Sequence, residues 1–392
     1  MTRRRESMRS RLLDSIPESY FGKTMGRKLE IGTKPLINTA VGIPDQKVPA
    51  EVLEAIQSAV QEPANNKYGV FRGKEVLKEA IQQFYLETYG VELDKDEEIC
   101  ILYGTKNGLV NLPLCVIEPG EGVLLPNPGY TDYLAGVKLA RGTVYELPLL
   151  PANRYWPDFD ALDSAVLDKT RLIYLNYPSN PTGAVATRAG FDEIIERFRG
   201  TKIQIVHDFA YAAFGFDAKN PSILQSEGAK EVAVEIYSLS KGFNMSGVRI
   251  GFAVGNKDIV GALNYYQDHT QVGMWGVVQE AAVSALALGE PFLETQNAIF
   301  RKRRDKVTSF LTEAGIPFEP MQGGIFLWLK IPDGYNSEAY VDDLLKKQSI
   351  LTTPGLPFGS NGDQYIRISL AISDEEIEEL LNRLAETKAL YH

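Results

Sequence analysis

The sequence predicts an α/β fold with a mostly parallel central sheet, helices on both faces of that sheet, and a smaller α+β domain. The chain has 392 residues, more than one ordinary core requires, and 44% of them are apolar, which suffices for two domains. From about residue 99, short apolar runs alternate with amphipathic stretches, as strands and crossover helices do in parallel sheets. These observations of size and pattern together favour two domains around unequal sheets.

The first part of the predicted sheet is easy to place. Residues 99–103 form an apolar run that predicts a strand, and the glycine-containing residues 104–108 predict the turn into a helix. Residues 172–176 and 203–208 predict two buried strands that end in polar residues. Because ligands of open α/β sheets bind outside the carboxyl ends of the strands, these polar ends mark a candidate site.

The pattern changes after the Gly-Glu-Pro sequence at residues 289–291. A long charged helix is predicted to begin at residue 292, and it is followed by strands and helices at residues 324–329, near 338–347, at 365–370 and at the C-terminus. We therefore expect an N-terminal arm that contributes to the small domain, a large domain that carries the candidate site, and the small domain itself, at residues 1–40, 41–289 and 290–392.

The charge balance and the cysteines limit the possible partners. Lysine and arginine total 41 against 51 acidic residues, and the net charge of −10 argues against nucleic acid or an anionic membrane as the main partner. No stretch reaches the roughly eighteen apolar residues of a membrane span, and the basic residues 1–5 are not followed by the apolar core of a signal peptide. With two cysteines and three histidines we expect no disulfide framework, no metal site and a cytoplasmic location.

The run IYSLSKGFNMSGVR at residues 236–249 is the most informative feature of the chain. It places Lys241 close to Ser238 and Ser240, and Arg249 follows. An arginine can fork two donors onto a phosphate dianion, and serine hydroxyls add donors without bulk. The lysine is then free to form an imine with a phosphorylated aldehyde cofactor, although the same residues taken alone could form a solvated surface loop.

Two strand ends supply groups for the ring of such a cofactor. In NYPSNPTG, at residues 176–183, proline-containing turns can aim the amide of Asn180 at a ring substituent, although Asn-Pro is also an ordinary turn. Asp208 and Tyr211 supply a carboxylate and a phenol at the end of another strand. The carboxylate could keep a pyridine nitrogen protonated, so that the ring acts as an electron sink, or it could simply cap a helix.

Two further segments could contact the phosphate and the ring of the same cofactor. Gly104, Thr105 and Lys106 offer backbone donors at a helix start, which is a common anion site. Tyr130 offers a flat face on which a pyridine ring could stack, or it could serve packing alone. Each signal is modest, but all of them occur in one order along the chain.

This ordered set of motifs resembles the class I and II aminotransferases of the fold-type I pyridoxal-phosphate family, over residues 37–370. The resemblance implies an enzyme with pyridoxal 5'-phosphate as cofactor, which exchanges the amino group between an L-amino acid and a 2-oxo acid. It also implies a homodimer with shared active sites.

The resemblance implies a role for each motif. Lys241 would bond to the cofactor, Asp208 would bind the pyridine nitrogen, Asn180 and Tyr211 would bind the phenolic oxygen, and Tyr130 would stack on the ring. The residues around the phosphate would be Gly104, Thr105, Lys106, Ser238, Ser240 and Arg249, and Tyr68 would reach the phosphate of the neighbouring subunit.

The substrate would be held by a second group of residues. Arg367 matches the arginine that binds the α-carboxylate, Gly42 matches the glycine that closes over it, and Asn180 would contribute to the same site. Without this context, an arginine in a strand could be a solubilising residue at a sheet edge. Lys241 would also act as a base, which requires that burial and nearby positive charge lower its pKa by about three units.

Within the family, the chain looks like the branch that holds the LL-diaminopimelate and the methionine-salvage aminotransferases. The motifs that carry this likeness are GTKNGL at residues 104–109, YLNYPSNPTGAV at 174–185, HDFAY at 207–211 and YQDH at 266–269, of which the last two favour the salvage type. Val248 departs from the pattern, because relatives often have an aromatic residue before the phosphate-binding arginine. The wall of the pocket therefore differs from that of many relatives.

The expected substrate has an uncharged side chain that is methionine-like or aromatic. No arginine other than Arg249 and Arg367 is visibly placed for a second carboxylate, which would be desolvated without a partner. The residues expected near the substrate are instead Tyr20, Phe21, Met274 and Trp275.

Other activities remain open. LL-diaminopimelate, alanine and aspartate aminotransferases are alternatives, and so is a pyridoxal-phosphate C–S lyase that expels a substituent from the substrate. A non-catalytic regulator with an aminotransferase-like domain would normally carry a DNA-binding domain, for which the segment before residue 37 is too short and the chain too acidic.

Overall fold

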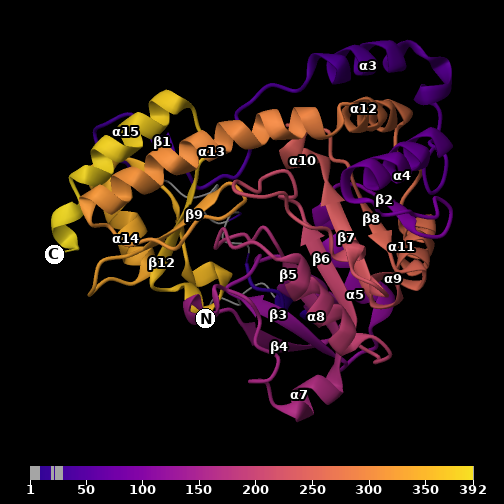
Figure 1. Ribbon diagram of the computed structural model, residues 1–392, viewed down its shortest axis with the longest axis horizontal. Coiled ribbons are helices and arrows are strands. Elements are labelled where there is room, and N and C mark those ends of the chain that lie inside the picture. Colours follow the sequence, from indigo (N-terminus) through magenta and orange to yellow (C-terminus); the bar gives the residue numbers. More distant parts are fainter. Residues whose placement is uncertain (1–8, 19–21, 23–29, 392) are drawn as a thin grey trace, which may run out of the picture.

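Two bodies of unequal size lie along one long helix, α13 (Gly289–Ala314), in the computed structural model of the chain (Figure 1). The structure describes residues 9–18, 22 and 30–391. Helix α13 packs against α4 (Glu75–Tyr89) in the larger body and against α15 (Asp374–Ala385) in the smaller one. The same helix therefore connects the two hydrophobic cores.

The larger body is built on a seven-stranded sheet. Strand β8 runs antiparallel to its neighbours β2 and β7, and the other neighbouring strands are parallel. In spatial order the strands are β2 (Ile99–Leu102), β8 (Gly251–Gly255), β7 (Ala233–Ser238), β6 (Gln204–Phe209), β5 (Thr170–Asn176), β3 (Gly122–Asn127) and β4 (Thr143–Pro148). The mostly parallel sheet and the strands expected at residues 99–103, 172–176 and 203–208 are confirmed.

Helices cover both faces of this sheet, as predicted. Strand β2 shows why, because Ile99 and Ile101 enter one hydrophobic core while Cys100 and Leu102 enter the other. One core includes residues of α4, α8 (Arg188–Phe198) and α12 (Gly276–Ala287). The other includes residues of α5 (Thr105–Val116), α6 (Tyr133–Leu139) and α11 (Lys257–Thr270).

The smaller body contains a three-stranded antiparallel sheet. Its central strand is β12 (Tyr365–Ser369), which pairs with β11 (Thr353–Pro354) on one side and β9 (Phe326–Lys330) on the other. Near the N-terminus, β1 (Ile37–Asn38) pairs in parallel with β10 (Ile350–Leu351). The segment around residue 37 therefore lies against the C-terminal part of the chain, while the domain boundaries expected at residues 40/41 and 289/290 stay predictions.

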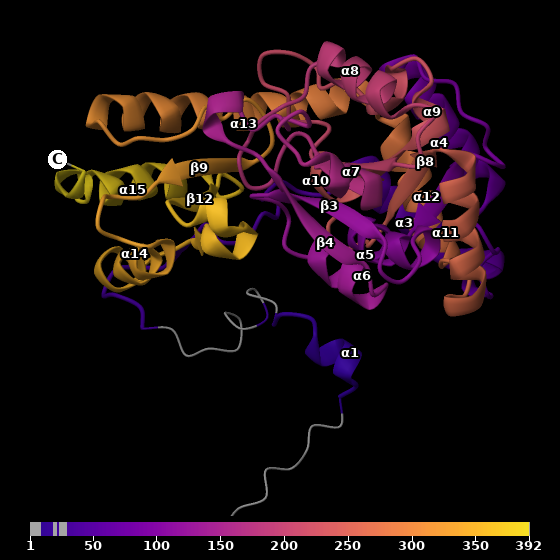
Figure 2. The ribbon, with the colours of Figure 1, turned by 90° about the horizontal axis from the view of Figure 1, so that it is seen from below.

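The remaining α-helices of the described residues are short, apart from α3. They are α1 (Arg11–Asp14), α3 (Ala50–Gln61), α7 (Ser164–Lys169), α9 (Ala229–Val232), α10 (Leu239–Gly242) and α14 (Ser337–Asp343). Figure 2 shows α1 beside α6, outside the layer of helices that covers the sheet. Within the described ranges, no helix combines the length and the apolar character that crossing a membrane demands.

The predicted start of the long helix was wrong by three residues. Helix α13 begins at Gly289 and includes Pro291 in its first turn, whereas we expected the Gly-Glu-Pro sequence to precede the helix. The first amides of a helix have no acceptor within the helix, so the missing N–H of a proline in that turn breaks no hydrogen bond.

Candidate active site

The carboxyl ends of the parallel strands bring most of the predicted site residues to one edge of the sheet. Gly104 follows β2, Asn180 follows β5, Asp208 lies near the end of β6, and Ser238 ends β7. Strand β8 runs the other way, so its beginning lies at the same edge, and Arg249 lies two residues before it. The reversed strand thus adds a guanidinium to this edge.

The guanidinium of Arg249 lies against the turn that precedes α5. Arg249 has φ 61°, a conformation that costs a non-glycine residue of order 1–3 kcal/mol and persists only where the surroundings impose it. A Cβ atom added to Gly104, which has φ 80°, would lie 2.5 Å from Nη2 of Arg249. The backbone conformation therefore favours glycine at residue 104, and a Cβ atom there would have to displace the guanidinium of Arg249.

Two buried serines precede the lysine, one at the end of β7 and one in α10. The Oγ of Ser238 accepts a 3.1 Å hydrogen bond from the amide of Ser240, and both residues are buried. Lys241 follows in the short helix α10. The hydroxyls, the amine and the guanidinium of Arg249 therefore come from one continuous segment.

The amine of Lys241 lies in a positively charged environment. It donates a hydrogen bond to the carbonyl oxygen of Gly42. Burial, followed by the positive charges of Arg367 and then Arg249, lowers its pKa to about 8. The expected decrease in the pKa is present, and Arg367 contributes more to it than Arg249 does.

Asp208 is a buried carboxylate whose direct partners are uncharged. Its Oδ2 accepts a 2.6 Å hydrogen bond from the hydroxyl of Tyr133, and its Oδ1 accepts one of 3.1 Å from the amide of Ala210. Burial raises the pKa of Asp208, although these hydrogen bonds and the charge of His207 oppose the increase. The sequence analysis did not single out Tyr133, although its place three residues after Tyr130 was a usable signal.

Arg367 is buried at the centre of the small sheet, so it is not a solubilising residue at a sheet edge. It lies on β12, the middle strand, and is only 3% exposed. Its Nη1 donates a 2.8 Å hydrogen bond to Oδ1 of Asn180, and its Nη2 donates one of 2.7 Å to the carbonyl oxygen of Ala40. Its guanidinium carbon lies 4.0 Å from the ring centroid of Phe326. The arginine thus joins the small sheet to the turn that follows β5.

Two aromatic residues of the prediction lie near these groups. Tyr211 packs edge-on against Phe326, with ring centroids 5.5 Å apart, and the charge of Arg367 partly offsets the increase in its pKa that burial causes. Tyr130 packs edge-on against Tyr133, with ring centroids 5.4 Å apart. The two phenols therefore lie next to the partners of Arg367 and Asp208, respectively.

Some predicted residues are not brought to this edge by the single chain. Tyr68 is 90% exposed and lines a surface hollow with Val272 and Trp275. The side chain of Lys106 forms a 2.9 Å ion pair with Asp132, so its backbone amide in the first turn of α5 is the remaining donor. Met274 is buried, and Tyr20 and Phe21 lie outside the described residues.

A buried network missed by the sequence analysis supports β6 and β7 beneath the site. Nδ1 of His207 lies 2.8 Å from a carboxylate oxygen of Glu235, and its Nε2 lies 3.0 Å from the carbonyl oxygen of Tyr177. Glu235 also accepts hydrogen bonds from the hydroxyls of Tyr85 and Ser222. These contacts fix the position of the residue that precedes Asp208.

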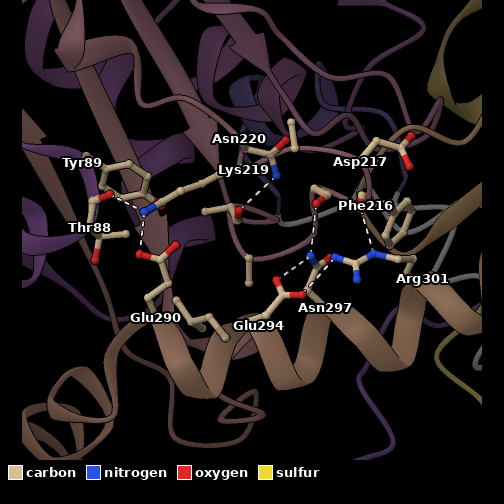
Figure 3. Close-up of a pocket in the computed structure, with 15 residues that line it drawn as sticks. Thr88, Tyr89, Phe216, Asp217, Lys219, Asn220, Glu290, Glu294, Asn297 and Arg301 are labelled. Carbon is tan, nitrogen blue, oxygen red and sulfur yellow. Dashed lines mark hydrogen bonds and ion pairs between the residues drawn. The ribbon is translucent and has the colours of Figure 1, made fainter.

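A separate cavity of about 140 Å³ lies between α13 and residues 212–220 (Figure 3). Its charged side chains are paired: Lys219 binds Glu290, Arg301 binds Glu294, and Asp217 binds Arg304, which lies outside the lining. None of the predicted site residues lines this cavity. It is therefore not the candidate active site.

Comparisons with known proteins agree on one family. A family model for aminotransferases of class I and II matches residues 34–384. The L-glutamine–4-(methylsulfanyl)-2-oxobutanoate aminotransferase of Bacillus subtilis is 41% identical over 381 residues, which cover 96% of this chain and 96% of that protein. An LL-diaminopimelate aminotransferase of Oleidesulfovibrio alaskensis is 37% identical over 377 residues, covering 95% and 97%. The structure of an aminotransferase from Staphylococcus aureus matches with a TM-score of 0.95 and 55% identity, covering 98% of this chain and 100% of that one.

Proposed function

This chain belongs to the class I and II aminotransferases, which exchange an amino group between an amino acid and a 2-oxo acid, and we propose that its site around Lys241 uses pyridoxal 5'-phosphate and prefers uncharged amino acids. The observation that carries the proposal is the amine of Lys241, whose pKa is lowered to about 8 by burial, Arg367 and Arg249. A lysine in such surroundings is suited both to covalent bonding with an aldehyde and to proton transfer.

The residues at the sheet edge fit this cofactor. Asp208 is a buried carboxylate with a raised pKa, and its hydrogen-bond donors, Tyr133 and the amide of Ala210, carry no charge. A protonated pyridine nitrogen would supply the positive charge that stabilises a buried carboxylate. The phosphate would find a guanidinium, two hydroxyls and the beginning of α5 as donors.

We assign the residues of this edge to the parts of the cofactor accordingly. Asp208 would hold the pyridine nitrogen, Asn180 and Tyr211 the phenolic oxygen, Tyr130 the ring face, and Lys241 the aldehyde carbon. The phosphate would be held by the amides of Gly104, Thr105 and Lys106 together with Ser238, Ser240 and Arg249.

Lys241 and Arg367 have complementary tasks in the proposed reaction. When bound, the cofactor would supply an electron sink that makes the proton on the substrate's Cα removable. Lys241 takes this proton at Nζ, and a pKa of about 8 leaves a substantial neutral fraction of the amine near neutral pH. Arg367 binds the α-carboxylate in a bidentate manner and thereby orients the Cα–H bond toward the lysine.

The surroundings of Arg367 favour substrates with uncharged side chains. The guanidinium lies 4.0 Å and 5.0 Å from the ring centroids of Phe326 and Phe358. The side chains of Val41 and Ile43, on either side of Gly42, are apolar and exposed. A second carboxylate among such groups would lose its hydration without gaining a partner. The relative in Bacillus subtilis, named for glutamine and 4-(methylsulfanyl)-2-oxobutanoate, supports a methionine-like substrate.

We propose that the enzyme works as a cytoplasmic homodimer in which Tyr68 completes the site of the neighbouring subunit. Tyr68 is 90% exposed in the single chain, and other large apolar side chains near it in sequence are exposed as well, among them Val70 and Phe71. Exposed apolar groups of this kind favour a subunit interface. Two free cysteines, Cys100 and Cys115, agree with a reducing compartment.

The experiment that tests the proposal is a panel of amino donors at equal cofactor loading. We expect a higher kcat/KM for methionine and phenylalanine than for aspartate, LL-diaminopimelate or alanine, with 2-oxoglutarate and 4-methylthio-2-oxobutanoate as acceptors. A preference for aspartate or LL-diaminopimelate would contradict the uncharged-substrate proposal. An amino acid with a sulfur substituent on Cβ, such as cystathionine, is added to test the lyase: its conversion to pyruvate, ammonia and the free thiol without keto-acid exchange would indicate the C–S lyase instead.

A further inference from the structure

Residues 40–47, which we name the strap, cross from the small body to the large one over the candidate site. The strap follows β1 in the small body and leads to α3, which packs against α12 of the large body. Its backbone touches the site twice, because the carbonyl oxygen of Ala40 accepts from Arg367 and that of Gly42 accepts from Lys241. The position of the strap therefore affects how the side chains of Arg367 and Lys241 are placed to bind a substrate.

The strap is attached to α13 by a bidentate pair of hydrogen bonds, which we call the fork. Nη1 and Nη2 of Arg303 donate to the two carboxylate oxygens of Asp45 over 2.7 Å and 2.8 Å. The same guanidinium donates through Nε to Asp374, over 2.9 Å, and through Nη1 to the carbonyl oxygen of Leu370, over 3.1 Å. The side chain of Arg303 is 4% exposed, so water contributes little to stabilising its charge. The two carboxylates and the carbonyl oxygen therefore provide most of that stabilisation.

Burial and geometry make this contact stronger than a surface ion pair. Burial alone would raise the pKa of Asp45, but the hydrogen bonds and the charge of Arg303 outweigh it and lower that pKa. A planar guanidinium suits a two-oxygen contact, whereas a lysine offers a single charged nitrogen. Arg303 is buried whereas Asp45 is partly exposed, so loss of the Asp45 carboxylate leaves a buried positive charge with less compensation. The attachment is therefore sensitive to small changes.

We propose that Arg303 is a positioning residue, which holds the strap through Asp45 so that Gly42 and Ala40 stay at Lys241 and Arg367. This inference rests on the proposed function, in which Arg367 binds the substrate carboxylate beneath the strap. Arg303 lies on α13, which runs along both bodies (Figure 1). The strap is thereby tied to the helix that connects the two cores.

The structure offers a matched pair of variants for the test. Asp45→Asn weakens the fork to the strap, and Asp374→Asn weakens the contact of the same guanidinium with the first residue of α15. Arg303→Lys keeps the charge but loses the fork. Both aspartate variants remove one negative charge beside Arg303. Asp374→Asn also weakens the 3.2 Å contact with Lys302, whereas Asp45→Asn alone weakens the attachment of the strap.

Release of the strap is measured by trypsin cleavage after Lys47, followed by mass spectrometry, because cleavage within a folded chain requires local opening. Asp45→Asn and Arg303→Lys should accelerate this cleavage several-fold, and Asp374→Asn should not. In steady-state assays the first two should raise the KM for the amino acid roughly tenfold with little change in kcat, because part of the binding energy is then used to order the strap.

Each result has one interpretation. Wild-type cleavage at Lys47 in Asp45→Asn, or equal acceleration in Asp374→Asn, would overturn the attachment. Faster cleavage with an unchanged KM would overturn its role in substrate binding. If no amino acid proves to be a substrate, the cleavage still decides whether Arg303 holds the strap, so failure of the proposed function is recognised separately.

Discussion

The hydroxyl of Tyr133 donates a 2.6 Å hydrogen bond to Oδ2 of Asp208, in a part of the large body where both residues are buried. Tyr133 lies at the beginning of α6, and Asp208 lies on β6. A buried carboxylate needs donors to remain ionised, because burial by itself favours the protonated form. The tyrosine therefore acts on the charge of the group that we assign to the pyridine nitrogen.

Tyr133→Phe should lower kcat by about tenfold, because the loss of one hydrogen bond to a buried charge corresponds to roughly 1.5 kcal/mol. Removal of the donor also raises the pKa of Asp208 further, since the Tyr133 hydrogen bond opposes the effect of burial. The control is Tyr174→Phe, which removes a buried hydroxyl that donates to the carbonyl oxygen of Leu109. Steady-state kinetics and thermal unfolding of both variants separate an effect on catalysis from a loss of stability. An equal loss of kcat in the two variants would contradict a specific role of Tyr133.

Asp208→Asn should retain the fold and much of the cofactor affinity but lose roughly 10²–10³ in kcat, the typical effect of removing an electrostatic partner of the reacting group. The amide keeps the shape of the side chain and removes its charge. Circular dichroism, cofactor content and kcat of the purified variant provide the measurement. An unfolded protein with normal activity per folded molecule would show that Asp208 is a structural residue.

Lys241→Ala should abolish transamination and also the cofactor adduct that borohydride fixes to the protein. The physical reason is that no other amine would then bond to the aldehyde or take up the Cα proton. Lys257→Ala is a suitable control, because this lysine is exposed at the beginning of α11. Near-normal turnover of the Lys241 variant would remove the central assignment of the site.

The amine of Lys241 should titrate near pH 8 in the cofactor-free protein. Its pKa is lowered to about 8, so the neutral, reactive form of the amine increases as the pH rises through this value. An exposed lysine reaches the same state only near pH 10.4, and Lys241 should therefore be labelled preferentially around pH 8. Competitive labelling with an amine reagent, read by mass spectrometry, gives the midpoint. A midpoint close to pH 10 would contradict the effect of burial and of the two arginines.

Gly104→Ala should reduce the affinity for pyridoxal 5'-phosphate at least tenfold, because the new methyl group would displace the guanidinium of Arg249. The added Cβ would lie 2.5 Å from Nη2 of this arginine, at a residue with φ 80°. Gly120→Ala is the matched control, since Gly120 has φ 93° and no atom within 4 Å of the added Cβ. Both variants carry the backbone penalty of a non-glycine residue at positive φ, about 1–3 kcal/mol. Equal affinity for the cofactor in the two variants would show that the contact with Arg249 is unimportant.

Much of the fold follows from local patterns that a sequence displays directly. The apolar runs at residues 99–103, 172–176 and 203–208 predicted β2, β5 and β6, because a strand buried on both faces needs continuous apolar residues. The motif order also identified the family, which the comparisons confirmed. The roles of the individual site residues stay predictions, although the structure brings Lys241, Asp208 and Arg249 to one edge of the sheet.

The sequence by itself thus determined the mostly parallel character of the large sheet and three of its strands, because these depend on the local alternation of apolar and polar residues. The order of the motifs determined the family. Tertiary structure alone decided which distant side chains meet. The fork between Arg303 and Asp45 joins residues 258 positions apart, and the contact between Tyr133 and Asp208 joins residues 75 positions apart. The central position of Arg367 in its sheet likewise depends on strand order. Periodicity specifies the face on which a residue lies but not the partner that packing brings to it, and for that reason these contacts had to be observed.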